Sequence, residues 1–210
     1  MLLSFRGNSL GVLIVGDSLP ANKNTVNNIG SVLDPRHPVY NSLIIPIKYY
    51  LNNYLNSCGF QLPLDKQNDD FFYYINAVEN PLTKKNPDLS NLGMELKKQE
   101  HKIILCMGNF AFWAVEQVFD RKTRRDNSIA KLGEIFTLRI NENNLKFPII
   151  LPILHNIANL KFEKCIEYIP DIARENYISY FHYVGVQLGQ LILRHIKDFQ
   201  FVTKTKEINK

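Results

Sequence analysis

Four short apolar runs without polar alternation recur along the chain, each bounded by polar or glycine-containing sequence. They are residues 11–16, 71–78, 101–107 and 147–154. A run of this kind must be covered on both faces, which is typical of the inner strands of a parallel sheet. A fifth segment, residues 133–140, alternates apolar and polar positions. It predicts a further strand, at the edge of that sheet.

Helical spacing of apolar residues fills the segments between these strands. Residues 41–58 repeat apolar positions every three or four residues, and Gly59 is placed to end that helix. Residues 109–119 follow a strand directly, and Gly108 at the junction would let the strand and the helix pack closely. Residues 163–196 are expected to close the chain as helices.

Residues 88–100 predict one further helix, which Asp88 can cap. The apolar members of this helix are expected to be Leu89, Leu92, Met94 and Leu96. By contrast, residues 22–38 are rich in Asn, Lys, Gly, Asp and Pro and show neither a helical nor a strand period. They predict a long loop, and loops of this length in compact domains are often functional.

Strands separated by helices favour an α/β fold. We expect a three-layer α/β/α arrangement with a central, mostly parallel sheet of about four to five strands. The length of 210 residues suits one domain, residues 1–210, with a substantial core. Hydrophobic residues make up 45% of the chain, which places it among ordinary globular proteins rather than disordered ones.

The charge of the chain permits a polyanionic partner without requiring one. Its formal net charge is +5 at pH 7, which is mild for a nucleic-acid-binding protein. Part of the excess lies in residues 121–125 and in the tail at 204–210. Such clusters are more often solvated surface than binding sites, so they do not identify a function on their own.

The cysteines and the N-terminal sequence favour an intracellular protein. Cys58, Cys106 and Cys165 are far apart and form no CxxC pair, so we expect neither a disulfide framework nor a metal cluster. The first residues lack a basic segment followed by a long apolar one, and no stretch approaches about 18 apolar residues. We therefore expect a soluble cytoplasmic protein without a cofactor and without membrane contact.

Polar side chains stand at the ends of three predicted strands. Asp17 follows the first strand, Asn76 lies near the end of the second and His155 follows the last. In open α/β sheets the ligand crevice lies outside the carboxyl ends of the strands. If these ends share one edge, a carboxylate, an amide and an imidazole converge there. Each residue can also have a purely structural role; His155, for example, can be a loop histidine that caps a backbone group.

The ordered set of motifs resembles the uracil-DNA glycosylase superfamily. No single motif is specific, but their order along residues 11–160 matches that family. The segment from Asn76 to Pro87 also looks like the iron–sulfur branch of the superfamily, although the cluster-binding cysteines of that branch are missing and no cluster is expected. The matching segments are VGDSLP (15–20), YINAV (74–78), ILCMGNFA (104–111) and LPILHNIAN (151–159).

This resemblance implies hydrolysis of the N-glycosidic bond of a uracil flipped out of DNA. In that reading Asn76 pairs with N3–H and O4 of uracil and refuses cytosine, whose edge presents the opposite pattern. His155 donates a hydrogen bond to O2 of the departing base. Asp17 positions water or stabilises the oxocarbenium-like sugar. Tyr40 is the candidate for stacking on the base, since the family places an aromatic residue in that stretch.

Further residues are assigned through the same resemblance. Gly16 belongs to the first motif and is counted with the residues that bind the substrate. The loop that follows the histidine contains Asn156, Asn159 and Lys161, which could hold backbone phosphates and make binding depend on salt. DNA that contains uracil or another damaged base is therefore the expected partner.

The chain departs from the family pattern at two places. Asp17 is followed by Ser-Leu-Pro rather than by Pro-Gly or Asp-Pro, and His155 is followed by Asn-Ile rather than by Pro-Ser. One alternative is therefore a glycosylase-fold protein without activity, which binds nucleic acid or another protein. A generic doubly wound nucleotide-binding enzyme is weakened because neither GxGxxG nor a Walker motif is present.

Overall fold

The structure, a computed structural model, describes residues 12–18, 39–62, 72–78, 87–98, 101–144, 146–155, 165–199 and 203–204. A parallel sheet of four strands lies at its centre, with the strands in the spatial order β3-β1-β4-β5. The strands are β1 (Val12–Ser18), β3 (Phe72–Val78), β4 (Ile103–Met107) and β5 (Ile149–Ile153). All four apolar runs of the sequence are thus strands, and the parallel sheet is confirmed.

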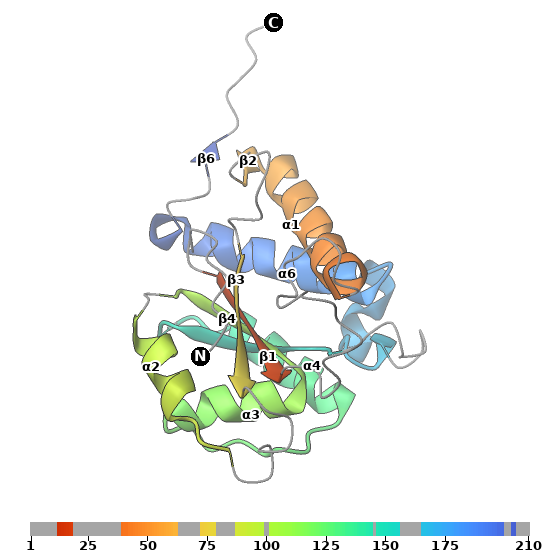
Figure 1. Cartoon of the computed structure of the whole chain (residues 1–210). Helices are drawn as coiled ribbons and strands as arrows, with labels where there is room; N and C mark the ends of the chain where they lie inside the picture. The colour runs from red at the N-terminus through yellow and green to blue at the C-terminus, as the bar shows by residue number, and fades with distance from the viewer. Residues whose placement is uncertain are drawn as a thin grey trace, which may run out of the picture.

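Helices cover both faces of this sheet and form the two outer layers (Figure 1). On one face, α1 and α6 pack against each other; on the other, α3 lies across the sheet with α2 and α4 beside it. The three-layer α/β/α fold expected from the sequence is therefore present. The helices are α1 (Ile45–Ser57), α2 (Ser90–Lys98), α3 (Gly108–Val118), α4 (Ile129–Ile140) and α6 (Tyr180–Arg194).

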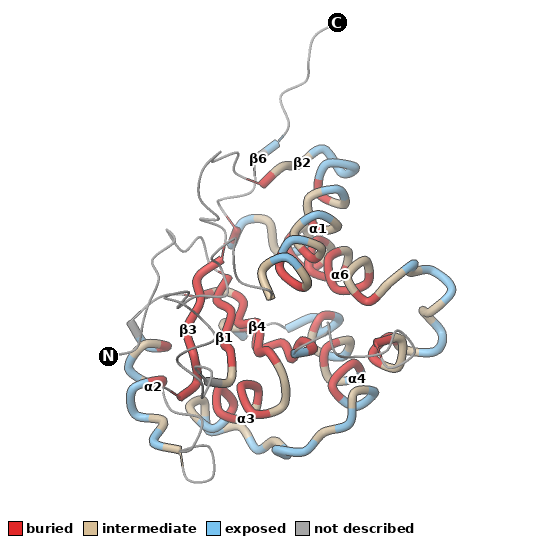
Figure 2. The backbone as a smooth tube through the Cα atoms, turned by 45° about the vertical axis from the view of Figure 1, so that its right-hand side comes forward, coloured by how far each residue is buried: buried red, intermediate tan, exposed pale blue. Residues whose placement is uncertain are grey.

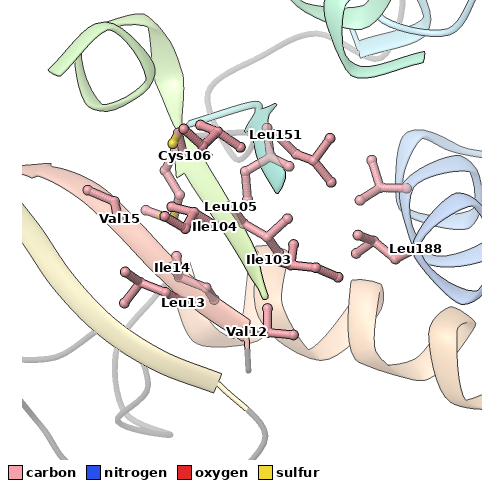
Figure 3. Close-up of a cluster of buried hydrophobic side chains, with 14 of the residues drawn as sticks. Val12, Leu13, Ile14, Val15, Ile103, Ile104, Leu105, Cys106, Leu151 and Leu188 are labelled. Atoms are coloured by element: carbon pink, nitrogen blue, oxygen red, sulfur yellow. The ribbon is translucent and has the colours of Figure 1, made fainter. Parts of the chain in front are cut away.

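The core follows from this layering, because every residue of β3, β4 and β5 is buried. Figure 2 shows the burial running through the strands and the inward faces of the helices. In Figure 3, Leu188 of α6 reaches towards the side chains of β4, among them Ile103. An uninterrupted apolar strand thus has a helical layer on each side to bury it, which explains why these runs lack alternation.

The local signals at α1 are confirmed. Ile47, Leu51 and Leu55 are buried at a spacing of four residues, and Gly59 has a φ of 79°, a backbone conformation that glycine adopts without strain. A π-helical turn, η1 (Tyr40–Ile44), runs directly into the helix. Pro46 is the second residue of α1, so its missing N–H leaves this preceding turn without one hydrogen-bond donor.

The strand predicted at residues 133–140 is wrong, because this segment lies within α4. Ser128 caps the helix, its hydroxyl accepting a hydrogen bond from the Lys131 N–H at 3.2 Å. In a strand, Phe136 and Leu138 would point to the same face. In the helix they diverge, so that Phe136 is buried and Leu138 is 62% exposed. The alternation was a coincidence, and the cap at Ser128 was the signal to follow.

The helix predicted at 88–100 is present as α2, and its apolar members do not all lie in the core. Leu92 and Leu96 are buried, whereas Met94 is 53% exposed, because it lies half a turn away from them. Asp88 accepts hydrogen bonds from the N–H and hydroxyl groups of Ser90 at the start of the helix. These bonds lower the pKa of the Asp88 carboxyl.

Shorter elements complete the described part of the chain. The 3-10 turns η4 (Asp171–Asn176) and η5 (Ile196–Asp198) flank α6, in agreement with a helical C-terminal region. Two short strands, β2 (Phe60–Gln61) and β6 (Thr203–Lys204), pair antiparallel; the sequence patterns did not predict this pair. The loop expected at 22–38 lies outside the described residues. Among the helices that the structure describes, none has the length and apolar character needed to cross a membrane.

Candidate active site at the carboxyl edge of the sheet

The strand order creates a switch point at the carboxyl edge of the sheet. From β1 the chain crosses to β3 on one side, and it then returns to form β4 on the other side of β1. The connections after β1 and β4 therefore leave the sheet in opposite directions. In open α/β sheets this divergence opens the crevice in which ligands bind. The residues to consider first are those that follow β1 and β4.

Asp17, near the end of β1, is held by the N-terminus of α3. Its Oδ1 accepts a hydrogen bond from the Ala111 N–H at 3.1 Å, and the side chain is half-buried. The first N–H groups of a helix have no partner within the helix, and they carry the positive end of its dipole. Met107, the N-cap residue of α3, provides no capping side chain. The carboxylate of Asp17 supplies this missing cap from a neighbouring strand.

Gly108 brings Asp17 and His155 to the same place. A Cβ at Gly108 would lie 3.0 Å from the Cβ of His155 and 3.7 Å from Oδ1 of Asp17. Gly108 also has a φ of +85°, which a residue with a side chain adopts only with strain. A glycine is therefore required here both for the turn from β4 into α3 and for the approach of the two polar residues. His155 is exposed, so its imidazole is accessible to a ligand.

Asn76 lies one strand further along this edge. It is paired in register with Gly16 on β1, and it is 8% exposed. The hydroxyl of Tyr74 donates a hydrogen bond to Oδ1 of Asn76 at 2.6 Å. A Cβ at Gly16 would overlap that hydroxyl and lie 3.0 Å from Oδ1 of Asn76. Gly16 thus makes room for the pair formed by Tyr74 and Asn76.

The electrostatics link this pair to Asp17. Burial raises the pKa of Tyr74, and the negative charge of Asp17 raises it further. The phenol therefore stays protonated and remains a donor to Asn76. Successive strand residues point to opposite faces, so Gly16 and Asp17 direct their substituents to different sides of the sheet.

The end of β5, just before His155, is held by side chains instead of by another strand. In the part of the chain that the structure describes, β5 is an edge strand of the sheet. Tyr180 accepts a hydrogen bond from the Leu154 N–H at 2.8 Å, and the Tyr168 hydroxyl donates to the Pro152 carbonyl. Both tyrosines are buried, so they fix the backbone that delivers His155.

Sequence reasoning missed these two tyrosines. Pro152 was an available signal, because proline within a sheet is confined to edge strands, strand starts and bulges. An edge strand that is buried needs hydrogen-bond partners for its outer side. Nothing in the sequence identified Tyr168 and Tyr180 as those partners.

The remaining predicted site residues are not brought into this group by the described contacts. Tyr40 is half-buried at the start of η1, where it packs against the core, and its role in stacking on a base stays a prediction. Asn156, Asn159 and Lys161 lie outside the described residues.

Two hollows in the described surface lie away from these residues. One, of about 310 Å³, is lined by Arg121, Arg139 and Lys146 among others. The other, of about 300 Å³, lies between α4 and the region of η4. Among the residues that the structure describes, no group of three His, Cys, Asp or Glu side chains is arranged to hold a metal ion.

The fold and this edge define a three-layer α/β protein whose candidate site lies at the switch point of a parallel sheet. The sequence matches no protein-family model and no curated protein. The function must therefore be inferred from the side chains at that edge.

Proposed function

We propose that this protein is a DNA glycosylase that hydrolyses the N-glycosidic bond of uracil, or of a related deaminated base, flipped out of DNA. One observation carries the proposal: the Asp17 carboxylate and His155 approach each other across Gly108 at the switch point. Asn76, the residue to which the resemblance assigns base recognition, lies on β3, the strand paired with β1. DNA is the partner in this reading, and the compartment is an intracellular one.

Hydrolysis of the glycosidic bond develops two opposite charges, and the site needs a group to stabilise each of them. Cleavage leaves negative charge on the uracil ring and positive charge on the sugar. Asp17 would stabilise the oxocarbenium-like sugar or orient the attacking water. The exposed imidazole of His155 would donate a hydrogen bond to O2 of the departing ring. The hydrogen bond from Ala111 fixes the carboxylate beforehand, so that little reorganisation is needed during the reaction.

Asn76 would read the base. Oδ1 of Asn76 is the atom that accepts the hydrogen bond from Tyr74, so Nδ2 points the other way. A carbonyl oxygen has two lone pairs, so Oδ1 can accept from Tyr74 and also from N3–H of uracil, while Nδ2 donates to O4. Cytosine presents an acceptor at N3 and a donor at N4. Opposite cytosine, Oδ1 would face the lone pair of N3, and Nδ2 would face the N4 amino group and lose its acceptor. An unsatisfied buried donor costs about 1–3 kcal/mol.

A second reading is a glycosylase-fold protein that binds nucleic acid or a protein without cleaving. Two contacts favour it, because Oδ1 of Asp17 already accepts from Ala111 and Oδ1 of Asn76 already accepts from Tyr74. Both polar groups would then serve the fold. The two readings differ in whether a glycosidic bond is broken, so one assay separates them.

The assay uses a duplex or single-stranded oligonucleotide with one uracil, incubated with the protein and then treated with alkali. Strand scission is expected at the uracil and not in a matched oligonucleotide with thymine. His155→Ala and Asn76→Asp should abolish scission while circular dichroism stays unchanged. Lys197→Ala, an exposed change on η5, should leave scission unchanged. Binding without scission by the native protein would favour the second reading.

A further inference from the structure

A basic loop, residues 121–125, lies on the outer side of α3. It contains Arg121, Lys122, Arg124 and Arg125. The last three are exposed, and the side chain of Arg124 is 86% exposed. The loop belongs to the connection between α3 and α4, which in Figure 1 runs beneath α3 and in Figure 2 is largely exposed.

This connection is fastened to the first turn of α3. Nδ2 of Asn109 donates to the Asn127 carbonyl at 2.6 Å, and the Asn127 N–H donates back to Oδ1 of Asn109 at 3.1 Å. Nδ2 of Asn127 also donates to the Arg124 carbonyl at 2.8 Å. Asn109 directly follows Gly108, which separates Asp17 from His155. The basic loop is therefore tied to the rim of the candidate site.

Arg125 is fixed by stacking. Its guanidinium lies 4.9 Å from the ring centres of both Phe110 and Trp113. Cation–π contacts at exposed sites contribute about 0.5–1 kcal/mol each. The two rings hold the guanidinium beside α3. A side chain that is already held in place loses less entropy when it binds an anion.

The connection also contains two acidic residues, Asp120 and Asp126, against its four basic ones. Asp126 lies 4.0 Å from Nε of Arg124, and both side chains are more than 80% exposed, so the pair is weak and yields to a stronger anion. The connection returns alongside the 11 residues of α3, a helix about 16 Å long. One strand of duplex DNA advances about 3.4 Å per nucleotide, so this length corresponds to roughly four or five phosphates.

We propose that residues 121–125 bind the phosphate backbone of DNA beside the candidate site, and that they supply affinity rather than chemistry. Phosphates are recognised by arginine and lysine side chains and carry no sequence information. This extends the proposed function, since it takes DNA as the partner. Its test, however, requires no cleavage.

The test is fluorescence anisotropy with a labelled duplex that contains no uracil, titrated from about 50 to about 200 mM salt. The variant carries Lys122→Ala and Arg124→Ala together. If two phosphate contacts are lost, the slope of log affinity against log salt should fall by about 2, and affinity at the lowest salt by at least about tenfold. The matched control carries Lys97→Ala and Lys197→Ala, which remove the same charge from exposed sites on α2 and η5. The control should retain the native slope.

The same proteins are also tested for binding to anionic vesicles that contain phosphatidylserine. Three outcomes would overturn the inference. They are an equal loss of DNA affinity in the variant and the control, no binding of the native protein to the duplex at the lowest salt, and a variant that loses affinity for the vesicles but not for DNA. Equal losses would mean that only net charge matters. If the protein binds DNA through this loop but never cleaves uracil-containing DNA, the inference is supported and only the glycosylase proposal is contradicted. The two failures are therefore distinguishable.

Discussion

Asp17 combines a structural contact with a candidate catalytic role, and substitution can separate the two. Asp17→Asn keeps an oxygen for the Ala111 N–H but removes the charge. We expect stability to change by less than about 1 kcal/mol, while scission of uracil-containing DNA falls by about 10²–10⁴-fold. Thermal unfolding and initial rates measure these quantities.

Asp17→Ala removes the charge and the acceptor together. It should lose the same activity and also about 1 kcal/mol of stability, the usual cost of a lost helix cap. Full scission by Asp17→Asn would reduce Asp17 to a helix cap and would remove it from the mechanism.

His101 makes stability depend on pH. It is buried and stacked on Tyr73 with ring centres 5.7 Å apart, and burial lowers its pKa to about 4. The unfolded chain, with a pKa near 6.5, binds the proton more readily. Above about pH 6.5 His101 is neutral in both states, and its contribution to stability is fully present. As the pH falls towards 4, the unfolded chain takes up the proton first, and the free energy of unfolding decreases by up to about 3 kcal/mol.

His101→Phe keeps a ring on Tyr73 and removes the titration. Urea unfolding of both proteins between about pH 4 and pH 7 should show a native curve that declines more steeply on acidification than that of the variant. Parallel curves would mean that His101 titrates normally in the folded protein.

At the scale of elements, the packing of α6 on α1 depends on small residues. A Cβ at Gly185 would lie 2.7 Å from Cβ of Tyr50 and 2.8 Å from the Leu51 nitrogen. The backbones of the two helices thus approach closely at this point. Gly185→Ala should force them apart and lower the free energy of unfolding by about 1–3 kcal/mol, as in other overpacked cores.

Gly93 in α2 provides the matched control. The nearest atom to a Cβ there is a Val118 methyl at 3.8 Å, an ordinary contact. Gly93→Ala should therefore stabilise the protein by about 0.5–1 kcal/mol, because alanine favours a helix over the unfolded chain. Chemical denaturation of both variants checks the contrast, and destabilisation of equal size in both would refute the packing argument.

The segment that became α4 shows the limit of pattern reading at this scale. Alternation over eight residues fits a strand, but burial every four residues at Leu132, Phe136 and Ile140 fits the helix that is present. Gly133 is also required, because a Cβ there would overlap the Tyr168 backbone. Packing of these residues against the β5 side of the sheet agrees with the cap at Ser128 and favours the helical period.

At the scale of the whole molecule, one ion pair ties elements from two layers together. Arg139 of α4 donates to both carboxylate oxygens of Glu116 of α3, at 2.6 and 3.0 Å, and to the Ile150 carbonyl of β5 at 2.6 Å. The side chain of Glu116 is 1% exposed and that of Arg139 is 22% exposed. The net contribution of such a buried pair to stability is small. Removing one partner is nevertheless costly, because the other charge then stays buried without a counter-charge.

Glu116→Gln should therefore lower the free energy of unfolding by about 2–4 kcal/mol, a little less than for a fully buried pair because Arg139 keeps some contact with water. Adding Arg139→Met to this change should cost less than the sum of the two single changes. Urea denaturation of the four proteins gives the coupling energy, and strict additivity would contradict a coupled pair.

The sequence by itself determined the fold class and the place of its polar residues. The apolar runs and the helical spacing of α1, α2 and α3 are local in origin, since each follows from which residues must leave water. The same patterns put Asp17 and His155 just outside the apolar runs and Asn76 at the end of another. They also carried the resemblance from which a function is proposed.

Only the tertiary structure decided how those residues meet. The strand order put β1 beside β4, so that Gly108 brought Asp17 and His155 together. The fold also placed Tyr180 of α6 at the end of β5. These contacts join segments that are far apart along the chain. No local preference encodes them, because they arise from the simultaneous packing of all the layers.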